Sequence, residues 1–192
     1  MTQHIEVLIL AAGAASRYGS AKQLINHQGK SLLQHCIDKA NEVCPSRVSV
    51  VLGANRELIE PLISQAKVIQ NHNWQQGLGA SIAAGVDHID PQSDGLLILL
   101  ADQIALTTDD LNLLIAAFGG DNTVSAYYAG RRGVPAIFPQ SHYAELGLLS
   151  GDSGAKELLQ RVDLNAVEID LPLAAMDIDT PEDWVQFLDS NH

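Results

Sequence analysis

The chain has 192 residues, a length typical of one domain, and its content of 46% hydrophobic and 18% charged residues is that of an ordinary globular protein. Its formal net charge of −12 argues against a protein that binds the nucleic-acid backbone, because such binding depends on lysine and arginine side chains that neutralise phosphates. The same charge is compatible with one bound nucleotide, which needs only a local group of cations.

Apolar runs alternate with segments of helical spacing along the chain. The first is Ile5–Leu10, a continuous apolar stretch that is typical of a strand covered on both faces. The later elements are predicted, in chain order, as helix 31–43, strand 47–52, helix 57–66, strand 67–70, helix 80–88, strand 95–101, helix 107–118, strands 123–128 and 134–138, helix 153–162, strand 166–169 and helix 180–188. Because strands that alternate with helices indicate right-handed crossovers, we expect a mostly parallel sheet. The predicted fold is one Rossmann-like α/β domain over residues 1–192, with a mostly parallel twisted sheet and helices on both faces.

Cys36 and Cys44 are the only cysteines, and neither lies in a CxxC pair or at the spacing of a zinc site. Free thiols in a reducing compartment are the expected state. The N-terminus lacks the pattern of a signal peptide, and no apolar run reaches the ~20 residues of a membrane span. These features predict a soluble cytoplasmic protein that has neither a membrane nor a nucleic acid as its partner.

In sheets of this kind the ligand site lies at the carboxyl ends of the strands. This rule selects two places, the loop after Leu10 and Asp102 at the end of the apolar run 95–101. The loop, in LAAGAASRYGSAKQL, contains Gly13 and Gly19, which let backbone N–H groups approach an anion.

Two cations accompany the glycines of this loop. Arg17 offers a fork of donors and Lys22 a mobile charge, a combination suited to a triphosphate. The spacing matches neither GxxxxGK[ST] nor GxGxxG. An ordinary strand-to-helix turn with surface cations explains the loop chemistry equally well.

The full wording of the loop resembles LAAGxSxRxGxxKxL, the signature of nucleotidyltransferases that build pyrophosphate linkages from nucleoside triphosphates. NHNWQQGLGASIAAG is similar to the middle segment of that superfamily, and LLILLADQ to its metal-binding strand end. GRRGVPAIF, LSGDSGAKELL and DIDTPEDW are similar to segments of its molybdenum cofactor cytidylyltransferase branch. The chain therefore resembles the molybdenum cofactor cytidylyltransferase family of MobA-like NTP transferases. The resemblance implies a fold of the nucleotide-diphospho-sugar transferase type.

The chemistry that this resemblance implies is nucleotidyl transfer with Mg²⁺ as cofactor. A terminal phosphate of the acceptor attacks the α-phosphorus of a nucleoside triphosphate in line, and pyrophosphate leaves. The implied catalytic residues are Arg17 and Lys22, which hold the β- and γ-phosphates, and Asp102, which binds the metal. The specific expectation is transfer of CMP from CTP to molybdopterin that carries molybdenum.

Asp102 ends a strand so apolar that the charge needs a reason. It is either a Mg²⁺ ligand or a residue at which the strand reaches solvent, and Mg²⁺ is usually held by one or two carboxylates together with phosphate oxygens. Asp177 and Asp179 are two residues apart, so on an extended segment they face the same way. The resemblance implies that one of them completes the metal site, and we favour Asp179. Asp179 or Thr180 also suits the N-cap of the last helix.

The resemblance also assigns binding residues. It implies as nucleotide-binding residues Leu10, Ala11, Ala12, Gly13, Arg17, Lys22, Asn71, Gly77 and Ser81. Ala12 narrows the space beside the base and so favours a pyrimidine, although a methylene-sized change is worth only about 1–3 kcal/mol. Ser81 is equally well explained as a serine at a helix N-terminus.

The family places the pterin acceptor near two later turns, which implies as acceptor-binding residues Gly133, Pro135, Gly151 and Asp152. Val134 stands where many relatives have the histidine of Gly-His-Pro, which removes any pterin contact that the histidine makes. Ile104 stands where many relatives have proline, a change that alters only the shape of the loop. Asp152 repels a phosphate and also suits the N-cap of the following helix.

The sequence is also compatible with two alternatives to cytidylyl transfer. One is a related enzyme that uses GTP or another phosphorylated acceptor, such as a sugar phosphate or methylerythritol phosphate. The other is a non-catalytic protein that holds the finished molybdenum cofactor and delivers it to a molybdenum apo-enzyme, the further partner expected here. Trp74 and Trp184 are expected to be packing residues, with ligand contact as a second interpretation for Trp74.

Overall fold

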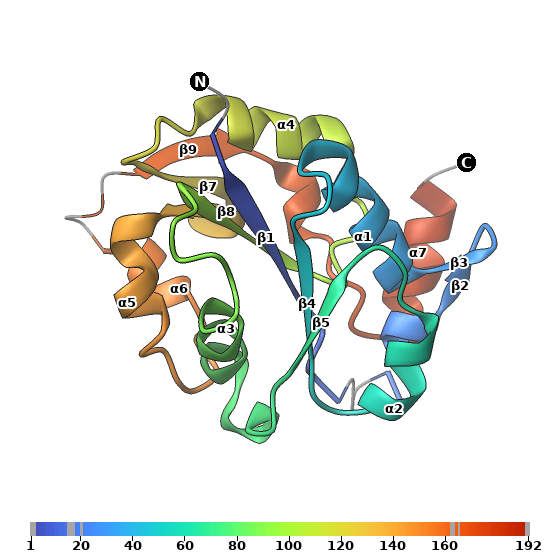
Figure 1. The fold of residues 1–192 in the computed structure, drawn as a ribbon. Coiled ribbons are helices and arrows are strands. Elements are labelled where there is room, and N and C mark those ends of the chain that lie inside the picture. Colours follow the sequence, from blue (N-terminus) through green and yellow to red (C-terminus); the bar gives the residue numbers. More distant parts are fainter. Residues whose placement is uncertain (1–2, 15–17, 20, 162–163, 165, 191–192) are drawn as a thin grey trace.

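A seven-stranded sheet runs through the middle of the molecule, in the order β5-β4-β1-β6-β8-β7-β9 (Figure 1). The computed structural model describes the chain apart from residues 1–2, 15–17, 20, 162–163, 165 and 191–192. The strands are β1 (Ile5–Leu10), β4 (Val48–Leu52), β5 (Lys67–Gln70), β6 (Gly95–Leu100), β7 (Thr123–Tyr128), β8 (Arg131–Pro139) and β9 (Ala166–Asp170). β8 runs antiparallel to both of its neighbours, and the other pairs in this sheet are parallel. The expected mostly parallel sheet is therefore confirmed, with one reversed strand.

The order of the strands creates a crevice for a ligand. From β1 the chain moves outward to β4 and β5, and it then returns to the other side of β1 to form β6. Open α/β sheets bind their ligands at such a switch point, outside the carboxyl ends of the strands. The crevice therefore lies beside the residues that follow Leu10 of β1 and Leu100 of β6.

Helices cover both faces of the sheet, α1 and α4 on one and α3, α5 and α6 on the other (Figure 1). Their bounds are α1 (Leu32–Val43), α3 (Leu78–Val86), α4 (Thr108–Ala117), α5 (Tyr143–Leu146) and α6 (Lys156–Leu159). Val7 and Ile9 of β1 enter the core under the first pair, and Leu8 and Leu10 enter the core under the others. This division follows from the strand, since its successive side chains point to opposite faces.

A smaller cluster lies outside these layers, where α7 (Pro181–Ser190) packs against the hairpin formed by β2 (Asn26–His27) and β3 (Lys30–Ser31). The ring of His27 meets the rings of Trp184 and Phe187 edge-on, at centroid distances of 5.4 and 5.7 Å. Trp184 is thus a packing residue, as expected.

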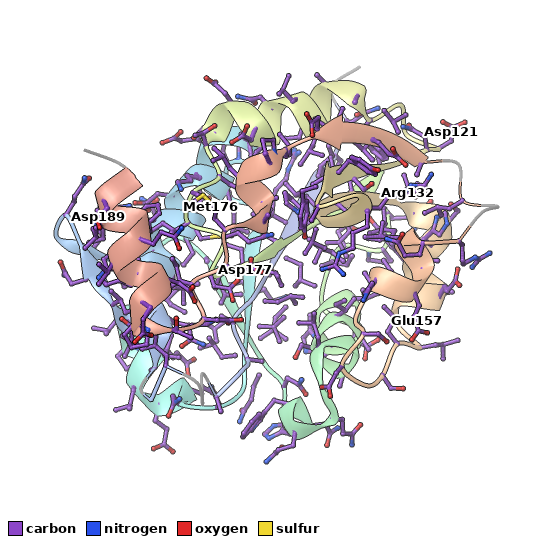
Figure 2. All side chains as sticks on the ribbon, turned by 180° about the vertical axis from the view of Figure 1, so that it is seen from behind. Asp121, Arg132, Glu157, Met176, Asp177 and Asp189 are labelled. Carbon is purple, nitrogen blue, oxygen red and sulfur yellow. The ribbon has the colours of Figure 1, made fainter. Side chains whose placement is uncertain are left out.

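The packing of α7 holds the segment before it next to the end of β6. Ile178 is buried, and its N–H donates to the carbonyl oxygen of Asp102 at 3.3 Å. Figure 2 shows Met176 and Asp177 on this segment, between the sheet and α7. Residues 177–179 are therefore brought to the crevice by the last helix of the chain.

Two predicted helices are shorter than expected. In place of helix 57–66 the chain forms α2 (Arg56–Ile59) and the 3₁₀ turn η2 (Glu60–Leu62), because Pro61 has no N–H to continue an α-helix. In place of helix 153–162 only α6 forms, since Gly151 and Gly154 turn the chain with φ of +74° and +55°. Residue 162 of that prediction lies outside the described residues.

The remaining 3₁₀ turns are η1 (Lys22–Leu24), η3 (Trp74–Gln76), η4 (Gln140–His142) and η5 (Pro172–Ala175). Over the residues that the structure describes, no helix has the length and apolar character needed to cross a membrane.

Candidate active site

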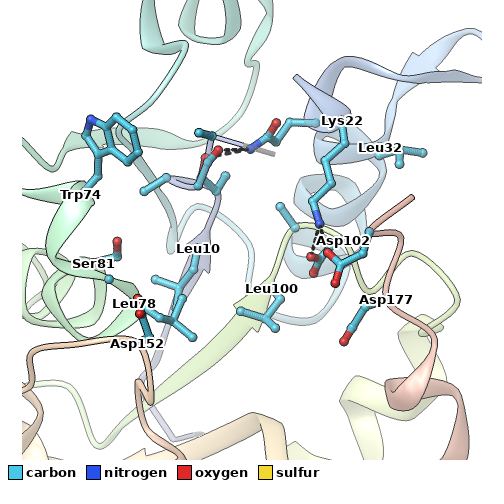
Figure 3. A pocket seen from close by; sticks show the side chains of 18 of the residues that line it. Leu10, Lys22, Leu32, Trp74, Leu78, Ser81, Leu100, Asp102, Asp152 and Asp177 are labelled. Carbon is cyan, nitrogen blue, oxygen red and sulfur yellow. Dashed lines mark hydrogen bonds and ion pairs between the residues drawn. The ribbon is translucent and has the colours of Figure 1, made fainter. Parts of the chain in front are cut away.

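A pocket of about 610 Å³ opens at the carboxyl ends of β1 and β6 (Figure 3). Its walls come from several segments: the loop that follows β1, the turn η1, the turn η3 together with the start of α3, the end of β6, and the segment that precedes α7. The residues proposed from the sequence that line it are Leu10, Ala11, Ala12, Gly13, Lys22, Gly77, Ser81, Asp102, Asp152, Asp177 and Asp179. Those that the structure places outside its lining are Asn71, Gly133, Pro135 and Gly151. Arg17 lies outside the described residues.

Gln23 holds the loop after β1 in place. The Nε2 of this buried side chain donates to the carbonyl oxygens of Ala11 and Gly13, each at 3.2 Å. The carbonyl oxygen of Ala12 accepts from the N–H of Ala54 at 3.0 Å. Among the described residues other than its two chain neighbours, no atom lies within 4 Å of a Cβ added at Gly13, and Gly13 lines the pocket. Sequence reasoning missed Gln23, whose only signal is its place directly after Lys22.

Lys22 bridges two of the proposed metal ligands. Its Nζ donates to Oδ2 of Asp102 and to Oδ1 of Asp179, both at 2.7 Å, although these residues are 80 and 157 positions away in the sequence. Burial is the largest influence on the pKa of Lys22 and lowers it, but the two carboxylates together raise the pKa above its ordinary value. The lysine is therefore held as an ammonium between the carboxylates (Figure 3).

Asp177 adds a third carboxylate to this end of the pocket. Burial, followed by the charges of Asp102 and Asp179, raises the pKa of Asp177 to about 6. Among the described residues, the Lys22 ammonium thus faces three carboxylates. Oδ1 of Asp102 is buried and has no hydrogen-bond partner among them.

The donor set fits a divalent cation. Carboxylate oxygens are the ligands that Mg²⁺ prefers, with phosphate oxygens and water to complete its coordination. Within the described residues no three acidic, histidine or cysteine side chains already stand close enough together to enclose a metal ion. Nζ of Lys22 donates to one carboxylate oxygen of Asp102 and one of Asp179, so an ion bound by these oxygens must displace the lysine from them.

The opposite wall of the pocket carries Trp74, Leu78 and Ser81 (Figure 3). The hydroxyl of Ser81 accepts from Nδ2 of Asn71 at 3.1 Å, and both residues are buried. Asn71 therefore lies behind Ser81 and positions it.

Gly77 and Gly79 are explained by close packing. A Cβ at Gly77 falls 2.4 Å from Oδ1 of Asp152, and a Cβ at Gly79 falls 2.7 Å from the backbone of Ser150. The N–H of Gly79 donates to the carbonyl oxygen of Gly151 at 2.8 Å. The turn 150–152 thus packs directly on the start of α3 and brings Asp152 to the pocket. The capping interpretation of Asp152 is wrong, because α6 begins only at Lys156 and has no side-chain cap.

Gly133 and Pro135 lie outside the pocket lining, and close packing explains the glycine here too. A Cβ at Gly133 falls 2.4 Å from the hydroxyl of Tyr128, which donates to the carbonyl oxygen of Val134 at 3.1 Å. This glycine therefore makes room for a tyrosine rather than for a ligand.

Gln103, the residue after Asp102, ties three segments together and was also missed. Its Nε2 donates to the carbonyl oxygens of Val134 and Ala174, at 3.0 and 2.8 Å. Ala174 lies three residues before Asp177, and Gln103 directly follows Asp102. The side-chain amide of Gln103 therefore links the segments that carry these two aspartates. On the other side, Nζ of Lys39 donates to the carbonyl oxygen of Ile104 at 2.7 Å.

The last helix is capped by Thr180 rather than by Asp179. The hydroxyl of Thr180 accepts from the N–H of Asp183 at 3.2 Å, and the Asp183 carboxylate accepts from the N–H of Thr180 at 2.8 Å. Of the two candidate caps, Thr180 takes the role, and the side chain of Asp179 reaches Lys22 instead.

Comparison with known proteins identifies the family. Residues 7–167 match the MobA-like NTP transferase domain. The chain belongs to this family. The family resemblance stated from the motifs is confirmed, and a MobA-like NTP transferase is a nucleotidyltransferase.

Relatives of this nucleotidyltransferase span the whole chain at modest identity. It is 28% identical to nicotine blue oxidoreductase of Paenarthrobacter nicotinovorans, over 94% of this chain and 95% of that one. It is 27% identical to molybdenum cofactor cytidylyltransferase of Escherichia coli K12, over 94% of each chain. The crystal structure of Rv0371c from Mycobacterium tuberculosis H37Rv superposes with a TM-score of 0.84 at 22% identity, covering 98% of this chain and 100% of that one. A manganese complex of the same mycobacterial protein superposes with a TM-score of 0.78 at 23% identity and the same coverage.

Proposed function

We propose that this MobA-like NTP transferase transfers CMP from CTP to molybdopterin that carries molybdenum, with Mg²⁺ as its cofactor. The main support for this proposal is that the pocket has one charged end and one largely apolar end. One end has a lysine among three carboxylates, and the other is formed mainly by small and apolar residues. A metal-bound triphosphate needs the first end and a nucleobase needs the second. Similarity to molybdenum cofactor cytidylyltransferase over 94% of each chain supports the choice of acceptor.

The reaction is a single displacement at phosphorus. An oxygen of the terminal phosphate of the acceptor forms a bond to the α-phosphorus of CTP. The bond from that phosphorus to the oxygen that bridges to the β-phosphate breaks, and pyrophosphate leaves with the electron pair. Because no protein atom becomes bonded to the substrate, the protein contributes position and charge.

Lys22 is the residue that holds the β- and γ-phosphates in this proposal. Asp102 and Asp179, with Asp177 beside them, hold Mg²⁺, which when bound neutralises charge on the phosphates. Since Lys22 now donates to Asp102 and Asp179, it must turn from these carboxylates to the phosphates when CTP binds. We assign Arg17, which lies outside the described residues, to the same phosphates.

The base lies at the other end, where Ala12 favours the smaller ring of a pyrimidine. We assign the acceptor to the side of the pocket that Asp152 lines, with Gly151 supporting that turn from behind. Gly133 and Pro135, predicted from the sequence to bind the acceptor, lie outside the lining of this pocket.

A second candidate keeps the reaction and changes the acceptor or the base. The chain is as similar to nicotine blue oxidoreductase, at 28% identity, as to the cytidylyltransferase, at 27%, so the acceptor does not follow from identity alone. Val134, where many relatives have histidine, points in the same direction. The non-catalytic delivery protein lacks such support, because a finished cofactor has no triphosphate for the lysine and carboxylate end of the pocket to hold.

Calorimetric titration of the protein with CTP, GTP, ATP and UTP, each with Mg²⁺, tests the choice of nucleotide. We expect CTP to bind at least tenfold more tightly than the others. A preference for GTP would move the protein to guanylyl transfer with the same mechanism. Binding of none of the four would contradict the proposed enzyme and favour a delivery protein.

A further inference from the structure

Trp74 is the one large aromatic side chain in the described lining of the pocket. It begins η3 and is half-buried, packed against the core that contains Leu10 and Ala12. Figure 3 shows it on the side of the pocket away from Lys22 and Asp102. Part of the Trp74 side chain therefore packs on the core and part of it borders the pocket.

Gly53 explains why the indole lies at the pocket. A Cβ at residue 53 falls 2.4 Å from Cβ of Trp74 and 2.6 Å from its Cγ, so only glycine allows this approach. The next residue, Ala54, donates its N–H to the carbonyl oxygen of Ala12 at 3.0 Å, which joins the same turn to the loop after β1. The carbonyl oxygen of Trp74 accepts from the N–H of Gly77 at 3.1 Å. The root of the side chain is thus fixed from behind, next to two pocket-lining segments.

The charges of the pocket lie mostly elsewhere. Lys22, Asp102, Asp177 and Asp179 gather at one end, whereas near Trp74 the lining is Ala12, Gly13, Leu78 and Ser81, with Asp152 beside Gly77. A nucleobase is flat and uncharged. Aromatic side chains stack on nucleobases whichever of the bases is bound.

We propose that Trp74 is the platform on which the base of the nucleoside triphosphate stacks. This inference rests on the proposed function, since it requires a nucleotide in the pocket. Stacking adds affinity for every base because every base has a π-face, so Trp74 sets how tightly the nucleotide binds. The choice among bases is then made by other residues of the lining, with Ala12 as our candidate.

The chain has only two tryptophans, which makes a direct optical test possible. The variant Trp184→Phe leaves Trp74 as the sole indole, and Trp184 lies in the α7 cluster with His27 and Phe187. We expect CTP with Mg²⁺ to change the fluorescence of Trp74 in this variant, saturating at the Kd that calorimetry gives. A structural role alone would leave the emission unchanged.

Affinity provides the second readout. We expect Trp74→Ala to weaken binding of CTP by roughly 5- to 150-fold, the range found for base–aromatic stacking, and Trp74→Phe to restore most of it. Gln76→Ala is the matched control, because this exposed residue belongs to the same 3₁₀ turn but lies outside the described pocket lining. The fold loss should be similar for every nucleoside triphosphate that the parent binds.

The outcomes separate the inference from the proposed function. If CTP binds the parent but Trp74→Ala binds it equally tightly and Trp74 emission is insensitive to it, the stacking role is refuted and the function stands. If no nucleoside triphosphate binds the parent, both are refuted. Should Trp74→Ala fail to fold, Trp74→Phe and the emission of Trp74 in the Trp184→Phe variant still decide between stacking and packing.

Discussion

Replacing Lys22 by methionine removes the only cation in the described lining of the pocket and leaves three carboxylates facing one another. Losing one partner of a fully buried ion pair costs about 3–5 kcal/mol, because the other charge stays buried without compensation. Here the side chains of Lys22 and Asp102 are 14% and 20% exposed, but that of Asp179 is 45% exposed. Solvent therefore screens part of the loss, and we expect a destabilisation of about 1–3 kcal/mol.

The expected shift in melting temperature follows from this loss of stability and from the size of the domain. For a chain of 150–250 residues, each kcal/mol lowers Tm by about 2–4 °C, so Lys22→Met should melt roughly 2–12 °C below the parent. Thermal unfolding followed by circular dichroism measures the difference. Lys156→Met is the control, since Lys156 is exposed and outside the pocket lining.

Mg²⁺ should then affect the two proteins differently. In the parent the ion competes with the Lys22 ammonium for the oxygens of Asp102 and Asp179. In Lys22→Met those oxygens no longer accept from Nζ of Lys22, and a ligand that binds only the folded state raises stability by RT ln(1 + [L]/Kd). We expect Mg²⁺ to raise the Tm of the variant more than that of the parent. Equal melting temperatures and equal responses to Mg²⁺ would refute the idea that Lys22 holds the place of the metal.

Three further variants test other parts of the site. Asp102→Ala should lower pyrophosphate release by about 100-fold or more, the effect of removing a group that stabilises charge in the transition state. Its Tm should fall no further than that of Lys22→Met, since the Lys22 ammonium keeps Asp179 as a partner. Turnover within a few-fold of the parent would exclude Asp102 from the reaction. Gln103→Leu should lower the free energy of unfolding by roughly 1–3 kcal/mol in urea titration, because the carbonyl oxygen of Ala174 loses a buried donor and that of Val134 keeps only the Tyr128 hydroxyl. An unchanged midpoint would show that these bonds are unimportant. Gly53→Ala should lower the free energy of unfolding by about 1–3 kcal/mol, because the added methyl group overpacks against Trp74. Calorimetry should also show weaker binding of CTP. A variant equal to the parent in both stability and CTP affinity would mean that Gly53 does not set the position of the indole.

Much of the fold could be predicted because burial on both faces leaves a clear mark in the sequence. The strands β1, β5 and β7 have the predicted bounds, since each is an apolar or β-branched stretch ended by a polar residue or a turn. The hairpin β2–β3 was missed, because strands of two residues carry no periodicity. Helix 57–66 was overextended because its apolar spacing continues past Pro61, where the backbone can no longer follow.

The candidate site divides in the same way. The sequence alone identifies Lys22, Asp102 and Asp179, because they belong to family motifs and two of these motifs follow the carboxyl ends of apolar strands. Gln23 and Gln103 could not be found, because each acts by donating to backbone carbonyls of segments that only the fold brings near. Gly133 was assigned to the acceptor from its motif, but its reason is the adjacent ring of Tyr128, which the sequence does not place.

Product formation tests the central claim most directly. The protein is incubated with CTP, Mg²⁺ and molybdopterin that carries molybdenum, and pyrophosphate is measured while the pterin product is identified by mass spectrometry, with GTP, ATP and UTP in parallel reactions. We predict one pyrophosphate for each cytosine dinucleotide formed, and little product from the other three nucleotides. Tight binding of CTP without pyrophosphate release, or release that does not depend on the pterin, would contradict cytidylyl transfer to this acceptor.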